Sequence, residues 1–178
     1  MPESEILSAL KSRRSCRAFK RKAVPKATLK AIAEAGLWAA NGKGRQCTKI
    51  VVVTDRKLRN RIAELNRKIG CWVEGFDPFY GAPVMMIVLG EAAWPTRVYD
   101  GSLVMGNLML AAHALGVDSI WIHRAREEFE SPEGKAILQE LGIEGDWEGI
   151  GHCALGYAAK PLPLPPPRKP DRLVWAGK

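Results

Sequence analysis

Residues 100–115 restrict the fold more than any other stretch, because they are apolar almost all the way round when drawn as a helix. A helix without a polar face must be buried on every side. In a chain of 178 residues, a second subunit is the easiest way to cover such a helix completely. We therefore expect this helix in the core and at a dimer interface. Its apolar residues are Leu103, Val104, Met105, Leu108, Met109, Leu110, Ala111, Ala112, Ala114 and Leu115.

Four apolar runs predict the strands. Residues 49–54 and 83–89 are continuous apolar runs, which are typical of strands buried on both faces. Residues 118–123 and 150–157 predict a third and a fourth strand. The order of these strands within a sheet does not follow from the patterns.

Four further helices are predicted from periodicity and end signals. The first covers residues 4–13, and the second runs from Pro25 to about residue 40. The third covers residues 56–69, and the last covers residues 131–142. The expected N-cap residues are Ser4 and Asp55. The second helix is expected to bury the face formed by Leu29, Ile32, Ala33, Gly36 and Leu37.

Residues 12–19 combine three arginines with two hydroxyls, directly after the first predicted helix. Guanidinium forks suit an anionic group such as a phosphate, because each fork can give two parallel charge-assisted hydrogen bonds. Each such bond is worth roughly 1.5–3 kcal/mol. A solvated basic turn at the end of the helix, where the dipole favours cations, is the alternative.

The charge of the chain leaves several kinds of partner open. It carries 27 basic and 19 acidic residues, for a formal charge of +8. The basic residues collect at 11–30, 43–68 and 160–178, and basic patches without interleaved aromatics support nucleic-acid binding only weakly. The chain has no run of 18 apolar residues, and its N-terminus lacks the apolar region of a signal peptide. We expect a cytoplasmic protein without a specific nucleic-acid partner or a membrane partner.

The four cysteines predict neither a disulfide framework nor a metal site. Cys16, Cys47, Cys71 and Cys153 are far apart, with no CxxC motif and no cysteine–histidine pair at metal-binding spacing. Reduced, mostly structural thiols are the usual state of cysteine in cytosolic proteins.

Two loops and the tail complete the outline. Residues 41–46 contain two glycines, which either turn the chain or let backbone amides approach a flat ligand. Residues 70–82 place aromatic residues among glycines and a proline, and predict a lid or an excursion that packs on a neighbouring surface. The tail is proline-rich and extended. We expect one domain over residues 1–159 and an arm over residues 160–178 that packs on a partner subunit.

Taken together, these pieces resemble the nitroreductase family of FMN-dependent oxidoreductases. The family's Arg-Arg-Ser-x-Arg-x-Phe motif is matched by residues 13–19, and its Ala-Pro-Ser-x-x-Asn-x-Gln-Pro motif is matched loosely by residues 39–47. Ala-Leu-Gly-x-x-x-x-Trp-Ile is matched by residues 114–122. Ala-Leu-Gly-Tyr and a downstream Pro-Arg are matched by residues 154–157 and 167–168. The motifs occur in the family's order over nearly the whole chain.

The resemblance implies an α+β fold of the nitroreductase type. Its sheet would be mixed and mainly antiparallel, and helices would surround it. It also implies an intertwined homodimer with two FMN sites at the subunit interface.

The resemblance further implies a phosphate clamp for FMN. Arg13 and Ser15, with Arg14 beside them, would hold the phosphate and the ribityl chain or ring edge. Arg168 from the tail would add a second fork on the phosphate. Arg17 would either hold the flavin or steer the phosphates of the nicotinamide reductant, with a surface role as the alternative.

Further residues would surround the flavin ring. Asn41, Gly44 and Gln46 would face the flavin of the other subunit. Trp121, Ile122 and His123 would lie along the ring, with backbone groups near flavin N5. Core packing is the alternative for Trp121. For His123 both an ordinary polar role and a role as proton donor stay open. These positions are the expected cofactor-binding residues, and we expect no catalytic nucleophile in the protein itself.

The second motif departs from the family pattern at Asn41, Gly44 and Cys47, where the family has serine, asparagine and proline. The asparagine side chain missing at Gly44 should loosen one contact to flavin or substrate. Cys47 would either place a thiol near the site or be buried structurally.

The activity implied is a ping-pong oxidoreductase. NADH or NADPH would deliver a hydride to flavin N5, and a small oxidised acceptor such as a nitroaromatic, a quinone or a flavin would then be reduced. The alternatives are a flavin-binding protein with a storage or sensor role, a specialised relative such as a flavin-fragmenting or dehalogenating enzyme, and a basic nucleic-acid binder.

Overall fold

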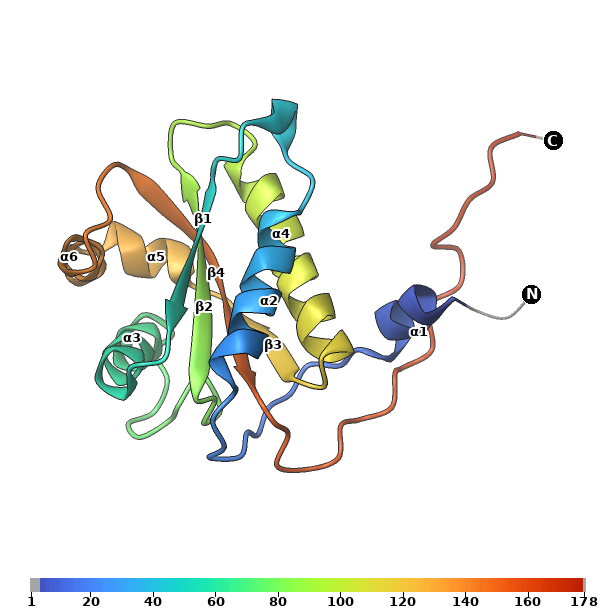
Figure 1. Ribbon diagram of the computed structural model, residues 1–178, viewed down its shortest axis with the longest axis horizontal. Coiled ribbons are helices and arrows are strands. Elements are labelled where there is room, and N and C mark those ends of the chain that lie inside the picture. The colour runs from blue at the N-terminus through green and yellow to red at the C-terminus, as the bar shows by residue number, and fades with distance from the viewer. Residues whose placement is uncertain (1–3, 178) are drawn as a thin grey trace.

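A four-stranded antiparallel sheet organises the fold, in the order β1-β2-β4-β3 (Figure 1). The computed structural model describes residues 4–177. Each neighbouring pair of strands is antiparallel. Within residues 4–177 the parallel pairing is limited to an isolated bridge between Ser15 and Ser119. The strands are β1 (Thr48–Val53), β2 (Val84–Glu91), β3 (Asp118–Ile122) and β4 (Trp147–Gly156).

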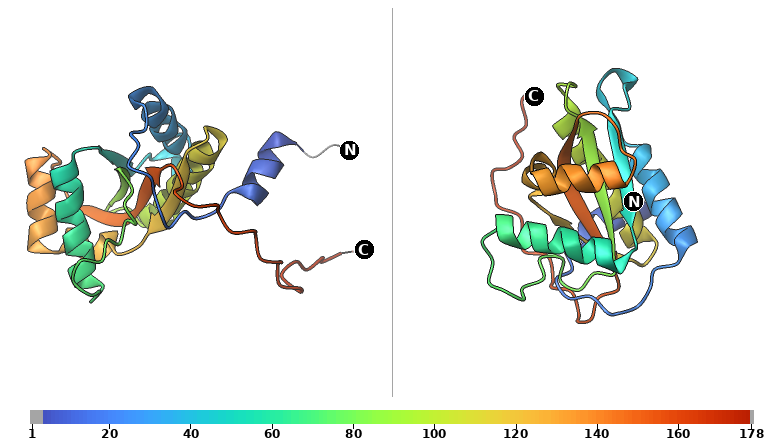
Figure 2. Two further views of the ribbon diagram at one scale, coloured as in Figure 1. Left: turned by 90° about the horizontal axis from the view of Figure 1, so that it is seen from below. Right: turned by 90° about the vertical axis from the view of Figure 1, so that its left-hand side faces the viewer.

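Helices cover both faces of the sheet and confirm the α+β class. Two helices, α2 (Lys26–Leu37) and α4 (Arg97–Ala114), pack on one face. Three helices, α3 (Arg56–Ile69), α5 (Ala125–Glu130) and α6 (Pro132–Glu140), pack on the other (Figure 2). Helix α1 (Glu5–Ser12) projects from this body, and the short 3-10 turn η1 (Gly42–Gly44) precedes β1.

The central strand β2 explains why its sequence is apolar without alternation. Successive side chains of a strand point to opposite faces. Met85, Ile87 and Leu89 enter the core beneath α3, α5 and α6. Their neighbours enter the core beneath α2 and α4. The prediction of a strand buried on both faces is therefore confirmed for β2.

The same prediction is wrong for β1, which is an edge strand. It pairs only with β2, and most of its residues are partly or fully exposed. Val52 keeps 42% of its surface exposed. A run of β-branched residues favours a strand but does not reveal whether the strand has one neighbour or two.

The predicted caps form as expected. The Ser4 hydroxyl accepts a hydrogen bond from the backbone N–H of Leu7 at 3.3 Å. The Asp55 carboxylate accepts one from Leu58 N–H at 2.8 Å. Each cap satisfies an otherwise unpaired helix-end donor, which is worth about 1 kcal/mol. These two residues therefore determine where α1 and α3 begin.

Other details differ from the sequence-based expectation. Helix α5 was not predicted, because six residues are too few to show a helical period. Leu37, expected in the buried face of α2, is 59% exposed. For α4, by contrast, we expect a second subunit to complete the cover, and within one chain Tyr99 and Leu103 are 72% and 50% exposed. An apolar stripe of α4 thus remains uncovered.

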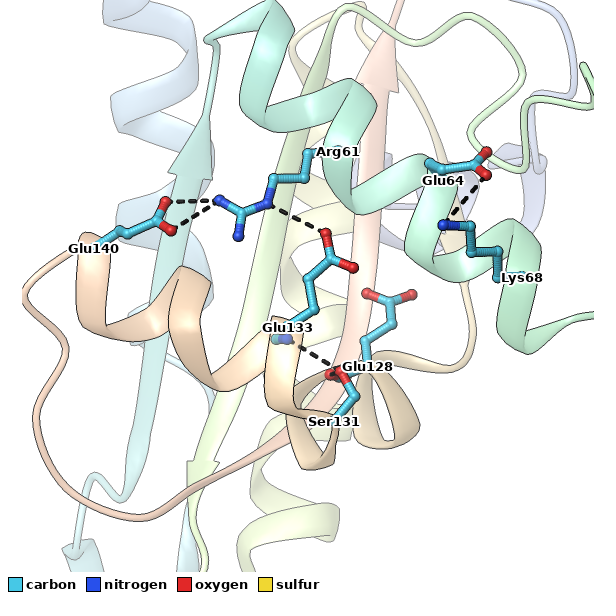
Figure 3. A network of polar contacts seen from close by, with 8 residues as sticks. Arg61, Glu64, Lys68, Glu128, Ser131, Glu133 and Glu140 are labelled. Carbon is cyan, nitrogen blue, oxygen red and sulfur yellow. Dashed lines mark hydrogen bonds and ion pairs between the residues drawn. The ribbon is translucent and has the colours of Figure 1, made fainter.

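Ion pairs fix α3 beside α6. The guanidinium of Arg61 lies 2.7 Å from the carboxylate of Glu140 and 3.3 Å from that of Glu133 (Figure 3). All three side chains are substantially exposed, so each pair contributes at most about 1 kcal/mol. Their main effect is on how the two helices are aligned.

The C-terminal segment has no regular structure from residue 161 to residue 177. It leaves the body at the end of β4 and extends on the same side as α1. Leu162 is partly buried and packs against the core, whereas the later apolar side chains Leu164, Leu173, Val174 and Trp175 are exposed. Among residues 4–177, no helix combines the length and the apolar character needed to cross a membrane.

Candidate functional site

Backbone hydrogen bonds fix the arginine-rich segment along the β3 side of the sheet. Cys16 N–H donates to Ser119 O at 3.0 Å. Further along, Lys20 N–H donates to Tyr157 O and Ala159 N–H donates to Ala18 O, both at 2.8 Å. The segment is therefore held in its middle, at Cys16, and at its C-terminal end. It is not a free turn after α1.

Two guanidinium groups in this segment carry unpaired buried donors. Arg14 Nη1 donates to the backbone oxygen of Arg13 at 2.5 Å. Arg13 Nη1 and Arg14 Nε are buried and have no hydrogen-bond partner. The nearby hydroxyl of Ser119, which pairs with Ser15 through its backbone, is also buried without a partner. Because a buried unpaired donor costs about 1–3 kcal/mol, an anion at this point would be stabilised by these groups.

A cavity of about 170 Å³ lies next to this segment. Four of the predicted flavin-site residues border it, namely Arg17, Trp121, Ile122 and His123. Arg17 and His123 have exposed side chains. The structure thus brings one half of the predicted ring site together within a single chain.

Residues 70–82 form the aromatic wall of this cavity. The rings of Trp72 and Phe76 lie 5.1 Å apart, and those of Phe76 and Tyr80 lie 6.1 Å apart, between centroids. All three rings border the cavity. The guanidinium of Arg124 lies 5.6 Å from the centre of the Trp72 ring. This excursion and Arg124 therefore give the cavity an aromatic, partly cationic wall.

Arg124 and Asn66 also border the cavity, and no sequence signal singles them out. Arg124 has a left-handed backbone with φ of 79°, which is uncommon for a residue other than glycine. Asn66 is fully buried on α3, and its amide donates to the backbone oxygen of His123 at 2.9 Å. Asn66 thereby fixes the turn that carries His123 and Arg124.

A buried polar cluster stands behind Asn66. Its amide also donates to the carboxylate of Glu128, whose other oxygen lies 2.7 Å from His152 Nε2. Asn66, Glu128 and His152 have no exposed surface. They come from α3, α5 and β4, so they join three elements behind the cavity.

Trp121 is largely a packing residue. Its indole covers Gly151 of β4 so closely that a Cβ at that glycine would overlap the ring. The side chain packs against the core beneath α2 and α4. Core packing, one of the two roles expected for Trp121, is therefore what its ring does.

The other predicted residues lie elsewhere in the single chain. Residues 41–46 precede β1, which is the edge strand opposite β3. Arg168 lies in the exposed C-terminal segment. Asn41, Gly44, Gln46 and Arg168 are therefore not brought to the arginine segment by folding of one chain.

Asp100 holds the 41–46 loop in shape. Its carboxylate accepts hydrogen bonds from Gly42 N–H at 3.0 Å, from the Thr96 hydroxyl at 2.8 Å and from the Cys47 thiol at 3.2 Å. Within the loop, Gln46 N–H donates to the side-chain oxygen of Asn41 at 2.9 Å. The loop is therefore anchored to the first turn of α4.

Replacing Asp100 with alanine should destabilise the fold by roughly 2–3 kcal/mol, because three donors lose their acceptor at a position only 4% exposed. The free energy of unfolding in urea would measure the loss. Asp100→Asn keeps one acceptor oxygen and should lose less. Equal stability of Asp100→Ala and the parent chain would show that water replaces all three contacts.

Cys47 is a structural thiol. It has no exposed surface, and burial together with its hydrogen bond to Asp100 raises the pKa of its thiol to about 11. Burial also raises the pKa of Cys153 to about 12 and raises the pKa of Cys16. The thiolate is the reactive form, so these three thiols are inert near neutral pH.

We expect one fast-reacting thiol per native chain at pH 8, namely the exposed Cys71. An aromatic disulfide reagent monitored by absorbance would count it, and Cys71→Ser should remove the fast phase. Unfolding in denaturant should release all four thiols. A second fast thiol in the native protein would contradict the burial described for the other cysteines.

The chemistry of the site does not point to a metal. Within residues 4–177, no group of three or more histidine, cysteine or acidic side chains is arranged to hold a metal ion. The arginine segment and the adjoining cavity instead offer guanidinium groups, a hydroxyl and aromatic faces. Such a set suits a planar ligand that carries an anionic group.

The chain is similar to known proteins in sequence and in structure. The sequence model of the Nitroreductase family matches residues 10–70 and 71–157. A crystal structure of an FMN-bound nitroreductase from Bacteroides fragilis is 29% identical, with a TM-score of 0.89 over 98% of this chain and 100% of that chain. An FMN-bound nitroreductase from Desulfitobacterium hafniense is 25% identical, with a TM-score of 0.89 over 99% of this chain and 100% of that chain.

A curated relative points the same way. A protein of Methanothermobacter thermautotrophicus, provisionally named an NADH dehydrogenase/NAD(P)H nitroreductase, is 28% identical over 124 residues. This match covers 66% of the chain and 60% of that relative. The family match spans the strands of the sheet and the helices on both of its faces. The chain therefore belongs to the nitroreductase family.

Proposed function

We propose that this protein is an FMN-dependent oxidoreductase that takes a hydride from NADH or NADPH and passes the electrons to a small oxidised acceptor. The observation that carries the proposal is the pair of buried guanidinium nitrogens on Arg13 and Arg14 that have no partner. Bound FMN would supply the redox chemistry, accepting two electrons and a proton as a hydride and later releasing them.

The phosphate end of FMN would be held by the arginine segment. A phosphate monoester carries about −1.5 to −2 charges, and the free donors of Arg13 and Arg14 would complete their hydrogen bonding on it. Ser15 stands between these arginines and the cavity along the chain. Its hydroxyl would bind the ribityl chain.

The ring edge would lie at the 170 Å³ cavity. Arg17, His123 and Arg124 border it, so positive or polarisable groups would face the electron-rich end of a reduced flavin. Asn66 would keep the backbone at His123 in place through its 2.9 Å hydrogen bond. The exposed His123 side chain would be available to donate a proton to an acceptor.

We also propose that the site is completed by a second subunit. Asn41, Gly44 and Gln46 of the partner subunit would form the other wall, and the C-terminal arm would bring Arg168. Large apolar side chains exposed in one chain would be covered in the dimer, namely Ile6, Leu7, Leu10, Leu37, Trp38, Tyr99 and Leu103. A dimer in light scattering at micromolar concentration supports this, and a stable monomer overturns it.

The function is tested by the visible spectrum. Purified protein, or protein reconstituted with FMN, should be yellow, and NADH or NADPH should bleach it in the absence of air. Reoxidation by a nitroaromatic or a quinone would complete the cycle. Failure to bind FMN overturns the proposal. Binding without reduction by either nicotinamide favours the storage or sensor alternative. We further propose that the protein acts in the cytoplasm.

A further inference from the structure

A groove of about 620 Å³ lies between the start of α3, residues 21–23 and residues 75–83. Its volume is within the range of small-molecule sites. None of the residues expected to bind FMN lines it. It adjoins the cavity of the candidate site, because Phe76 lines both.

Five cations and two carboxylates line the groove, and both carboxylates are already paired. Glu64 binds Arg67 at 2.7 Å and lies 3.8 Å from Lys68 (Figure 3). Asp77 binds Arg59 at 2.5 Å. The acidic groups are therefore neutralised within the protein, and the groove keeps a positive surplus.

Of the three cations left without a carboxylate partner, Lys22 lies 4.5 Å over the Tyr157 ring, and Arg21 and Arg56 account for the free part of the surplus. Both side chains are exposed, and within residues 4–177 neither has a hydrogen-bond or ion-pair partner. Arg56 is the first residue of α3, and no acidic residue lies in the first turn of that helix. The helix dipole disfavours cations at this end, and the Asp55 carboxylate that caps α3 offsets only part of this repulsion, so a further anion bound at Arg56 would be favourable.

The rest of the lining suits a nucleoside. Ala63, Phe76 and Pro83 offer apolar surface to a flat base. Thr54 and Asn60 offer polar groups to a sugar.

We propose that this groove binds the adenosine half of NADPH, with Arg21 and Arg56 on its 2′-phosphate. The nicotinamide half would pass Phe76 into the neighbouring cavity. This inference rests on the proposed function, because it assigns the reductant of the same site. NADH lacks the 2′-phosphate and with it about −1.5 to −2 charges. The protein should therefore use NADPH in preference to NADH.

Binding can be measured without turnover. Calorimetric titration of the FMN-loaded protein should show that 2′,5′-ADP binds at least about tenfold more tightly than 5′-AMP. Arg21→Ala and Arg56→Ala should each weaken 2′,5′-ADP binding by about five- to tenfold and leave 5′-AMP binding unchanged. Lys57→Ala is the matched control, because Lys57 is the next residue of α3, equally exposed and outside the groove.

The same variants should separate the two nicotinamides in anaerobic flavin reduction. We expect the Kd for NADPH to rise by about five- to tenfold in each arginine variant. The limiting reduction rate and the Kd for NADH should not change. Equal use of both nicotinamides by the parent protein, or an equal loss in Lys57→Ala, overturns the inference.

The outcomes also separate this inference from the proposed function. If both nicotinamides reduce the flavin and the arginine variants behave like the parent protein, the function stands and the groove assignment fails. If 2′,5′-ADP binds through Arg21 and Arg56 but neither nicotinamide reduces the flavin, the groove binds a 2′-phosphorylated nucleotide and the proposed oxidoreductase function fails.

Discussion

Replacing Arg13 with alanine should weaken FMN binding by on the order of a hundredfold. The free Nη1 of Arg13 is buried without a partner, so a phosphate there would gain a charge-assisted hydrogen bond that desolvation strengthens. Such bonds are worth roughly 1.5–3 kcal/mol each, and about 1.4 kcal/mol corresponds to a tenfold change in Kd. Titration of the apoprotein with FMN, followed by quenching of flavin fluorescence, would give the two Kd values.

Two variants make this result specific. Arg13→Lys keeps the charge but loses the fork, so it should bind FMN with an affinity between those of the parent chain and Arg13→Ala. Lys20→Ala removes one exposed positive charge from the same segment and should leave Kd within about threefold. An Arg13→Ala protein with the parent melting temperature and an unchanged Kd would remove Arg13 from the phosphate clamp.

Replacing Glu128 with alanine should destabilise the fold by roughly 3–5 kcal/mol. The change removes one of the two acceptors of the Asn66 amide and the partner of His152 Nε2, in a region with no exposed surface. His152 Nδ1 already lacks a partner, so the imidazole would then be wholly unpaired. The free energy of unfolding in urea would measure the loss. The midpoint should fall without a change in slope.

Glu133→Ala is the matched control for that measurement. This variant also removes a glutamate side chain, but one that forms an exposed ion pair with Arg61. The loss in the free energy of unfolding should therefore stay below about 1 kcal/mol. Glu128→Gln keeps the shape and one acceptor and should fall between the two. If Glu128→Ala were as stable as Glu133→Ala, the buried cluster would not contribute to stability.

The parts of the fold that could be predicted are those with local signals. Ser4 and Asp55 determine helix starts by bonds within one turn, so both caps could be read directly. The status of β1 could not be predicted, because edge position depends on which strands pair and not on Val52 or its neighbours. Helix α5 was missed because it is short and begins after Arg124, whose left-handed backbone has no marker such as glycine in the sequence.

Only part of the candidate site could likewise be predicted from the sequence. Residues 13–17 could be recognised because their charge is concentrated in one short segment. The cluster behind the cavity could not be recognised, because Asn66 and Glu128 are 62 positions apart and meet only when α3 packs beside α5. The places of residues 41–46 and Arg168 depend on a second chain, and so they remain predictions.

Strand β3 is shorter than its neighbour β4. It pairs only with residues 152–156 of β4, so the first half of β4 lacks a neighbouring strand on that side. An unpaired strand edge is a template for intermolecular pairing and aggregation. Helix α5 approaches this half so closely that a Cβ at Gly149 would overlap the backbone oxygen of Ala125. Gly149 thus lets a six-residue helix lie directly against the face of the half of β4 that lacks this neighbouring strand.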